Sequence, residues 1–257
     1  MEIFVICSAA LLGSALTFFS GFGLGTILLP VFALFFPLEI SVALTAIVHF
    51  LNNIFKLFLV GRNIDPAILL RFGLPSIVAA FLGAFSLNYL SDVPVLFSID
   101  FLEKTRHITL VKLVIASLLM FFALFELVPQ LKHLEFNKKY LPLGGLLSGF
   151  FGGLSGHQGA LRSAFLVRSG LSKERFVATG VAIACLIDVS RLSVYARNIA
   201  KVSEKIDFSL LAFATLSAFG GAYFGNKILK KMTISSVQIF VAIALMIFSV
   251  FLGLGMI

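Results

Sequence analysis

Seven apolar stretches, each close to the length of a membrane-crossing helix, constrain this chain more than any other feature. A helix needs about 20 apolar residues to cross the hydrocarbon core of a bilayer. Only 12% of the residues are charged, against about a quarter in soluble proteins. The sequence therefore predicts an all-α polytopic membrane protein and excludes a soluble enzyme, a disulfide scaffold and a coiled coil. The stretches are 3–20, 40–60, 67–90, 108–127, 176–195, 208–229 and 234–254.

Two further apolar regions are interrupted by glycine. The first break spans 20–25 and is followed by an apolar piece that stops at Pro37; the second spans 152–159 and is followed by a piece that ends near Ser169. Both pieces are too short for a comfortable span, and glycine clusters loosen helices. We therefore expect two glycine-broken or re-entrant helix pairs among about eight to ten transmembrane helices.

The two halves of the chain share residues in the same order. Gly25 corresponds to Gly159, Thr45 to Thr179, Asp65 to Asp207, and Gly83 to Gly225. Ala116 and Leu119-Met120 correspond to Ala242 and Leu245-Met246, and Arg62-Asn63-Ile64 recurs as Arg197-Asn198-Ile199. The preserved order predicts a duplicated unit, with a first transmembrane repeat at 1–127, a connecting loop at 128–139 and a second transmembrane repeat at 140–257.

Basic residues in the loops test the topology. Lys and Arg concentrate in cytoplasmic loops, which also explains the net charge of +8 without a nucleic acid partner. If each broken segment enters the membrane and returns, the basic residues in the loops divide ten against five between the two sides. If each broken segment is a single span, the same residues divide less decisively. This favours inverted repeats with both termini outside. The ten are Arg62, Lys132, Lys138, Lys139, Arg168, Lys173, Arg175, Lys227, Lys230 and Lys231; the five are Lys104, Arg106, Arg197, Lys201 and Lys205.

Inverted repeats that each carry a broken helix are typical of secondary transporters. The N–H groups at a helix start are unpaired and carry partial positive charge, so the break can form an anion site. We expect Gly23, Gly25, Thr26 and Gly159 to line that site. Close helix packing is the alternative explanation for such glycines.

Arg162 follows the second break by three residues and is flanked by apolar sequence. A guanidinium there costs a few kcal/mol on insertion scales unless it is paired or hydrated, and it suits bidentate binding of an oxyanion. Alternatively, its tip reaches water at an interface. His157 and Gln158 can also donate to an oxyanion, and His157 can take up a proton; equally, both can cap the broken backbone.

The span 40–60 carries a polar stretch formed by His49, Asn52, Asn53 and Lys56. The spacing of four between His49 and Asn53 places them on one helix face, and we expect both to line the site. Lys56 is a weaker candidate, since its side chain can extend toward the surface that carries Arg62. Membrane-embedded Asn can also serve only as contact between helices.

Thr45 and Thr179 are expected either to cap backbone groups or to supply hydroxyls at the site. Asp188 and Arg191 are three apart in the span 176–195 and form an expected structural ion pair, with proton coupling through Asp188 as the alternative. No nucleotide-binding, hydrolase or zinc-protease motif occurs, so no enzyme activity, metal or cofactor is expected. Cys7 and Cys185 fall in unrelated spans.

Around these same residues the sequence resembles the sulfite exporter TauE/SafE family, and the resemblance extends over nearly the whole chain. The resemblance rests on Gly21 to Pro30 followed by Ala43-Leu44-Thr45, and on Gly149 to Gly159 followed by Ala178-Thr179-Gly180. The second half departs from the pattern, with Ala164 at a position where the family commonly has Pro. The resemblance implies transport of sulfite, sulfoacetate, an organosulfonate or another sulfur-containing anion.

The leading hypothesis is therefore a secondary transporter for a small sulfur-containing oxyanion in the inner (cytoplasmic) membrane, working by alternating access, with export favoured. The alternatives are an anion channel, a proton-coupled uptake permease, and a membrane assembly or thiol-handling factor. Expected partners are the anion and the lipid bilayer, and a homodimer is left open.

Overall fold

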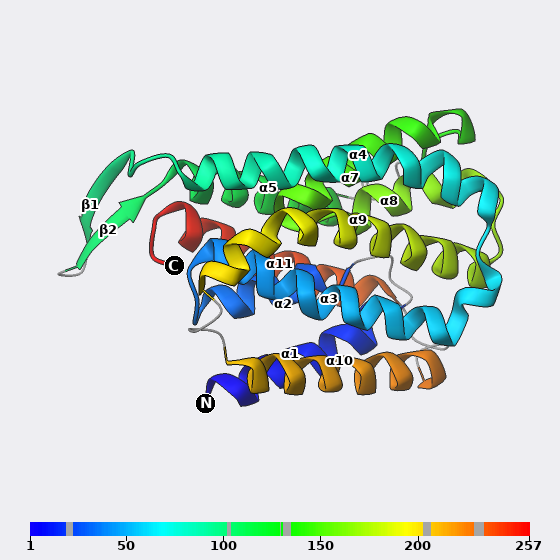
Figure 1. Cartoon of the computed structure of the whole chain (residues 1–257), viewed down its shortest axis with the longest axis horizontal. Helices are drawn as coiled ribbons and strands as arrows, with labels where there is room; N and C mark the ends of the chain where they lie inside the picture. The colour runs from blue at the N-terminus through cyan, green and yellow to red at the C-terminus, as the bar shows by residue number, and fades with distance from the viewer. Residues whose placement is uncertain (19–22, 102–103, 129, 131–134, 203–206, 229–233) are drawn as a thin grey trace.

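The fold is a bundle of ten α-helices among the residues that the computed structural model describes, which are all except 19–22, 102–103, 129, 131–134, 203–206 and 229–233 (Figure 1). The helices are α1 (Glu2–Thr17), α2 (Gly25–Ala33), α3 (Leu38–Val60), α4 (Pro66–Ser91), α5 (Leu110–Leu127), α7 (Leu141–Ser155), α8 (Gly159–Leu166), α9 (Lys173–Val202), α10 (Phe208–Ile228) and α11 (Ile234–Gly253). Short 3₁₀ turns η1 (Gly61–Asn63), η2 (Lys138–Tyr140) and η3 (Val167–Ser169) lie at helix ends.

Five of the helices, namely α3, α4, α5, α9 and α10, are long and apolar enough to cross a membrane. Large apolar side chains project outward from them, as expected where lipid rather than water is the surrounding solvent. Phe85 on α4 is 59% exposed and Leu216 on α10 is 62% exposed. The prediction of a polytopic helical membrane protein is confirmed.

The sequence did not indicate one element, a β-hairpin between α4 and α5. Strand β1 (Phe97–Phe101) pairs antiparallel with β2 (Lys104–Ile108), with Phe97 opposite Ile108. The hairpin projects beyond the helices at the end of the molecule where both termini lie (Figure 1). Its residues are too few and too polar for a span, so their backbone groups pair with each other outside the bundle.

Each glycine-broken region forms a helical hairpin, which decides between the two arrangements considered from the sequence. The end of α8 returns to the start of α7, since Phe136 N donates to Ala164 O at 3.1 Å. Likewise, Leu28 and Phe32 of α2 share a core cluster with Ile6 and Ala10 of α1. The two hairpins enter from opposite ends of the bundle (Figure 1).

The hairpins are held by parallel partners from the other half of the chain. Helix α7 packs along α4, where a Cβ on Gly145 would lie 2.2 Å from Phe72 O and one on Gly153 would lie 2.1 Å from Ala80 O. Helix α1 packs along α10, where a Cβ on Gly221 would lie 2.1 Å from Leu11 O. Only glycine allows backbones to approach this closely.

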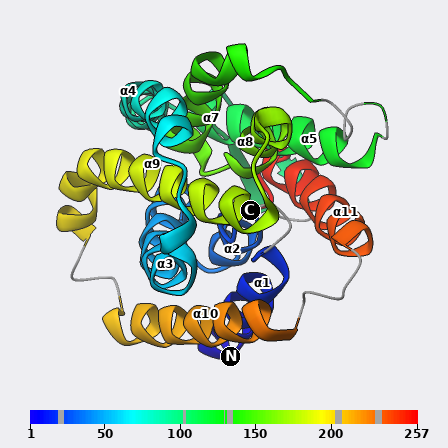
Figure 2. The same cartoon turned by 90° about the vertical axis from the view of Figure 1, so that its right-hand side faces the viewer.

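Two other large contacts, α5 with α11 and α3 with α9, pair helices that correspond between the halves, in antiparallel orientation, and α9 also packs against α4. Helices α5 and α11 place Ala116 beside Gly253 and Met120 beside Ser249, while α3 and α9 cross near the middle of the bundle. Viewed along the long axis, α4 and α10 lie at opposite edges with α9 and α3 between them (Figure 2). These are the contacts that two inverted repeats would make, and the duplication itself stays a prediction.

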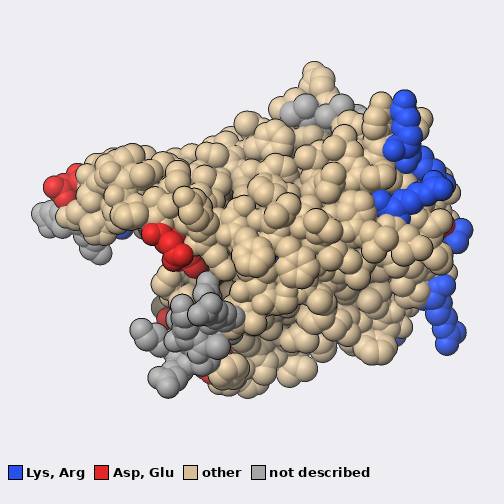
Figure 3. Space-filling view, turned by 45° about the horizontal axis from the view of Figure 1, so that its top comes forward, with Lys and Arg blue, Asp and Glu red and all other residues tan. Residues whose placement is uncertain are grey.

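Charged side chains separate along the long axis (Figure 3). We call the end rich in Lys and Arg the basic face, and the end with both chain termini and the β-hairpin the terminal face. The turns and helix ends at the basic face, namely η1, η2, η3, the start of α9 and the end of α10, carry the exposed basic side chains of Arg62, Lys138, Lys139, Arg168, Lys173, Arg175 and Lys227. The side chains of Lys104, Lys132, Arg197, Lys201, Lys205, Lys230 and Lys231 lie outside the described part of the chain.

Candidate anion site

The tips of the two hairpins meet inside the bundle. A Cβ on Gly25, the first residue of α2, would lie 3.6 Å from Gly156 O in the turn between α7 and α8. Gly156 has φ +81°, a left-handed conformation that favours glycine. The tip is fixed from both sides, since Ser148 Oγ donates to Gln158 O at 3.1 Å and Arg162 N donates to the same oxygen at 3.0 Å.

A cavity of about 30 Å³ lies beside the tips, toward α3, α8 and α9; we call it the tip cavity. This volume is enough for about two water molecules, at roughly 10–15 Å³ each. Among the described residues, its lining carries the two cationic side chains of Lys56 and Arg162 and no acidic side chain. The lining residues are Thr17, Phe18, Gly23, Leu24, His49, Asn53, Lys56, Arg162, Ser163, Leu166, Phe176, Val177, Gly180 and Val181.

Arg162 lies in the first turn of α8 and is buried in the cavity wall, with 7% of its surface exposed. Its Nη1 donates to Gln158 Oε1 at 3.4 Å. Opposite it, α9 has Gly180, where a Cβ would lie 3.4 Å from Arg162 Nε. The absence of a side chain at Gly180 therefore leaves room for the guanidinium, which stays inside the bundle instead of extending to an interface.

Lys56 joins Arg162 in this cavity, whereas the sequence favoured an extended side chain directed toward Arg62. It is 4% exposed, and its Nζ lies 5.3 Å from the ring centroid of Phe18, within the range of a cation–π interaction. The signal was present in the spacing, because His49, Asn53 and Lys56 follow each other at i, i+4 and i+7, which is one helix face.

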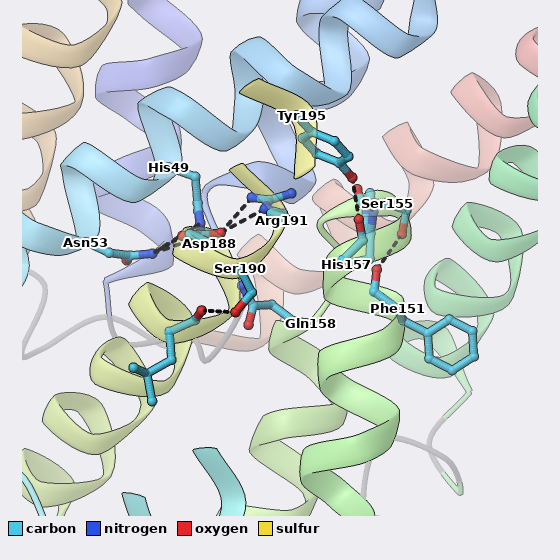
Figure 4. A network of polar contacts seen from close by, with 12 residues as sticks. His49, Asn53, Phe151, Ser155, His157, Gln158, Asp188, Ser190, Arg191 and Tyr195 are labelled. Carbon is cyan, nitrogen blue, oxygen red and sulfur yellow. Dashed lines mark hydrogen bonds and ion pairs between the residues drawn. The ribbon is translucent and has the colours of Figure 1, made fainter. Parts of the chain in front are cut away.

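A network of polar contacts connects α3 to α9 next to the cavity (Figure 4). His49 Nδ1 lies 2.6 Å from Asp188 Oδ2, and Asn53 Nδ2 donates to the same oxygen at 3.2 Å. Arg191 Nη2 lies 2.7 Å from Asp188 Oδ1, so the pair within α9 forms as the spacing indicates. The contact of this pair with His49 depends on how α3 and α9 cross, which no local pattern reveals. All four side chains are buried.

His49 connects this network to the tip cavity. Its Nε2 faces the α1–α2 tip, where a Cβ on Gly23 would lie 2.9 Å away. Gly23 therefore leaves space for the imidazole at the cavity wall. His49 can contact a ligand in the cavity while its other nitrogen contacts Asp188.

His157 and Thr26 lie in a separate, smaller cavity on the other side of the tips. This cavity also includes Gly159 and has a volume of about 10 Å³, close to the lower limit for one water molecule. His157 Nδ1 donates to Ser155 O at 3.0 Å, and its ring stacks on Phe122 with centroids 6.0 Å apart.

The two threonines that correspond across the halves have different surroundings. Thr179 Oγ1 accepts a hydrogen bond from Asp65 N at 2.9 Å, so Thr179 caps the turn between α3 and α4 and is not part of the cavity lining. Thr45 contacts the tip, with its Cγ2 3.5 Å from where a Cβ on Gly25 would lie. Its buried Oγ1 has no hydrogen-bond partner among the described residues.

The fold and the buried cations define a multi-pass membrane protein with a polar centre where two helical hairpins meet. The sequence model of the sulfite exporter TauE/SafE family matches residues 6–252, and the chain belongs to this family. Its members are membrane transporters and not enzymes. No curated protein and no solved structure matches the chain.

Proposed function

We propose that this protein is a secondary transporter that moves a small sulfur-containing oxyanion, such as sulfite, sulfoacetate or an organosulfonate, across the cytoplasmic membrane. The observation that carries the proposal is the pair of buried cations, Lys56 and Arg162, in one cavity where the hairpin tips meet. In the part of the chain that the structure describes, no acidic side chain lines that cavity.

The chemistry of the cavity favours an oxyanion. The Arg162 guanidinium offers a planar set of donors that matches two oxygens of one anion, and Lys56 adds a second positive charge. Each buried charge costs a few kcal/mol on membrane-insertion scales, a cost that a bound anion offsets. The first turn of α2 and that of α8 add backbone dipoles directed at the same region.

Alternating access of two inverted repeats fits the position of the cavity. Its lining comes from both halves of the chain, with Lys56 on α3 and Arg162 on α8. The two hairpins belong to different halves and meet through a glycine contact, which allows one half to move against the other.

Export is the favoured direction. By the positive-inside rule, the basic face lies in the cytoplasm and both termini lie outside. At a potential of 100 mV, inside negative, each exported negative charge gains about 2.3 kcal/mol. A dianion therefore leaves the cell without a coupling ion, whereas uptake requires co-transported protons or sodium.

The test is flux in proteoliposomes that contain the purified chain. Saturable sulfite flux that is accelerated by sulfite on the opposite side supports a carrier, and thermal stabilisation across sulfite, sulfate, thiosulfate, sulfoacetate and taurine ranks the substrates. Single-channel currents would instead establish a channel. Loss of pH dependence in Asp188→Asn would identify proton coupling, as in the uptake alternative.

A further inference from the structure

Three buried polar groups beside the α7–α8 tip have no hydrogen-bond partner among the described residues. They are Arg191 Nη1, His157 Nε2 and Gln158 Nε2. Their side chains are 0%, 4% and 0% exposed. A buried polar group without a partner costs about 1–3 kcal/mol, and more when it is charged. Three such groups at one turn indicate that something else satisfies them during function.

The opposite end of each of these side chains is held in place. Arg191 contacts Asp188 through Nε at 3.0 Å, and Gln158 accepts from Arg162 at its amide oxygen. His157 donates from Nδ1 to the Ser155 carbonyl. Figure 4 shows Arg191, Gln158 and His157 around the tip. The unpartnered atoms are therefore fixed in orientation, which lowers the entropy lost when a ligand binds.

The correspondence between the two halves of the sequence relates these side chains to the lining of the tip cavity. The offset of 135 residues that places Arg62 on Arg197 also places Lys56 on Arg191 and Asn53 on Asp188. The offset of 134 that relates Gly25 to Gly159 places Gly23 on His157. Arg191 therefore lies within one residue of the position on α9 that corresponds to Lys56, since Thr45 and Thr179 are related by 134, and its Nη1 lies beside the opposite tip, 2.7 Å from where a Cβ on Gly156 would be.

We propose that Arg191, His157 and Gln158 form a second oxyanion subsite, which holds the substrate when the tip cavity has closed and the path to the terminal face has opened. This rests on the proposed transport function and deepens it. The anion would move from Lys56 and Arg162, past the layer formed by His49, Asn53 and Asp188, to Arg191. There it competes with the Asp188 carboxylate for the guanidinium.

The histidine specifies the chemistry of the ligand. Because Nδ1 donates to a carbonyl, neutral His157 presents a lone pair at Nε2. That atom accepts a hydrogen bond from a hydroxyl, while Arg191 Nη1 and Gln158 Nε2 donate to bare oxygens. The subsite therefore matches a protonated oxyanion such as hydrogen sulfite, which carries both kinds of group.

The test measures the half-saturating sulfite concentration separately from each face in oriented proteoliposomes. His157→Phe keeps the stacking on Phe122, and Arg191→Lys keeps the charge opposite Asp188. Each variant should raise the half-saturating sulfite concentration at the terminal face about tenfold, equivalent to about 1.4 kcal/mol. The increase at the basic face should be much smaller. Phe122→Leu is the matched control, because it alters the same packing without a polar group.

If the ratio of the half-saturating sulfite concentrations at the two faces is unchanged in both variants while flux remains saturable, the second subsite is overturned and the transport function stays intact. Absence of sulfite-stimulated flux in the unaltered protein would instead overturn the transport function. If one variant fails to reach the folded state in a melting experiment, the ratio in the other decides.

Discussion

His49 on α3 and Asp188 on α9 are 139 residues apart in sequence, yet His49 Nδ1 lies 2.6 Å from Asp188 Oδ2 in the middle of the bundle. Both side chains are buried, at 2% and 0% exposure. The contact joins the two central helices of the two halves. It also gives the Asp188 carboxylate a second partner besides Arg191, so a negative charge is tolerated next to a cavity that we expect to bind anions.

The Asp188–Arg191 pair should act as a unit in stability. Asp188→Ala leaves the Arg191 guanidinium buried without its partner, which typically costs about 3–5 kcal/mol. We expect the melting temperature of this variant in detergent, monitored by circular dichroism, to decrease strongly. The neutral double variant Asp188→Asn with Arg191→Gln should recover most of the loss. A double variant as unstable as Asp188→Ala would contradict the ion-pair interpretation.

Arg162→Ala should abolish anion flux while the folded protein remains abundant in the membrane. The guanidinium is placed in the cavity wall, so its removal takes away the main oxyanion donor. The matched control is Arg168→Ala, which removes an arginine from the same hairpin but at the basic face, where it pairs with Glu135 at 2.6 Å. We expect near-normal flux in the control. Normal flux in Arg162→Ala would remove Arg162 from the site.

Lys56→Gln should raise the half-saturating sulfite concentration about tenfold or more, because a fully buried charge loses about 1.4 kcal/mol or more of attraction to the anion. Equilibrium binding of sulfite to the purified protein measures this directly. Lys139→Gln is the control, since that lysine is exposed on the basic face. Equal sulfite affinities for both variants would show that Lys56 only packs against Phe18 and does not bind the anion.

Gly83→Ala should separate α4 from α7. A Cβ at that position would lie 2.1 Å from Phe150 O, so the two helix backbones must move apart. We expect a loss of about 2 kcal/mol or more, by analogy with overpacked cores, seen as reduced thermal stability in detergent. Gly220→Ala on α10 is the comparison, because no atom lies within 4 Å of its Cβ position. It should be neutral or stabilising.

Much of the site was recognisable from local patterns. The glycine clusters predicted both helical hairpins, the i,i+3 spacing indicated the Asp188–Arg191 pair, and isolation in apolar sequence singled out Arg162. Lys56 was underestimated because a lysine near a helix end can extend to the surface, and only the neighbouring Phe18 and Arg162 show that it does not. The β-hairpin was missed because its pairing is made outside the bundle by a short polar segment.

The sequence by itself determined the class of protein, the family resemblance and the two breaks, because these depend on composition and on spacing within one segment. The tertiary structure decided which face of each helix meets which neighbour. It brought His49 to Asp188 and Lys56 to Arg162, and it placed His157 on the other side of the tips. Helix crossings depend on close backbone contacts at glycines such as Gly83 and Gly153, and the partners of such contacts are distant in the chain.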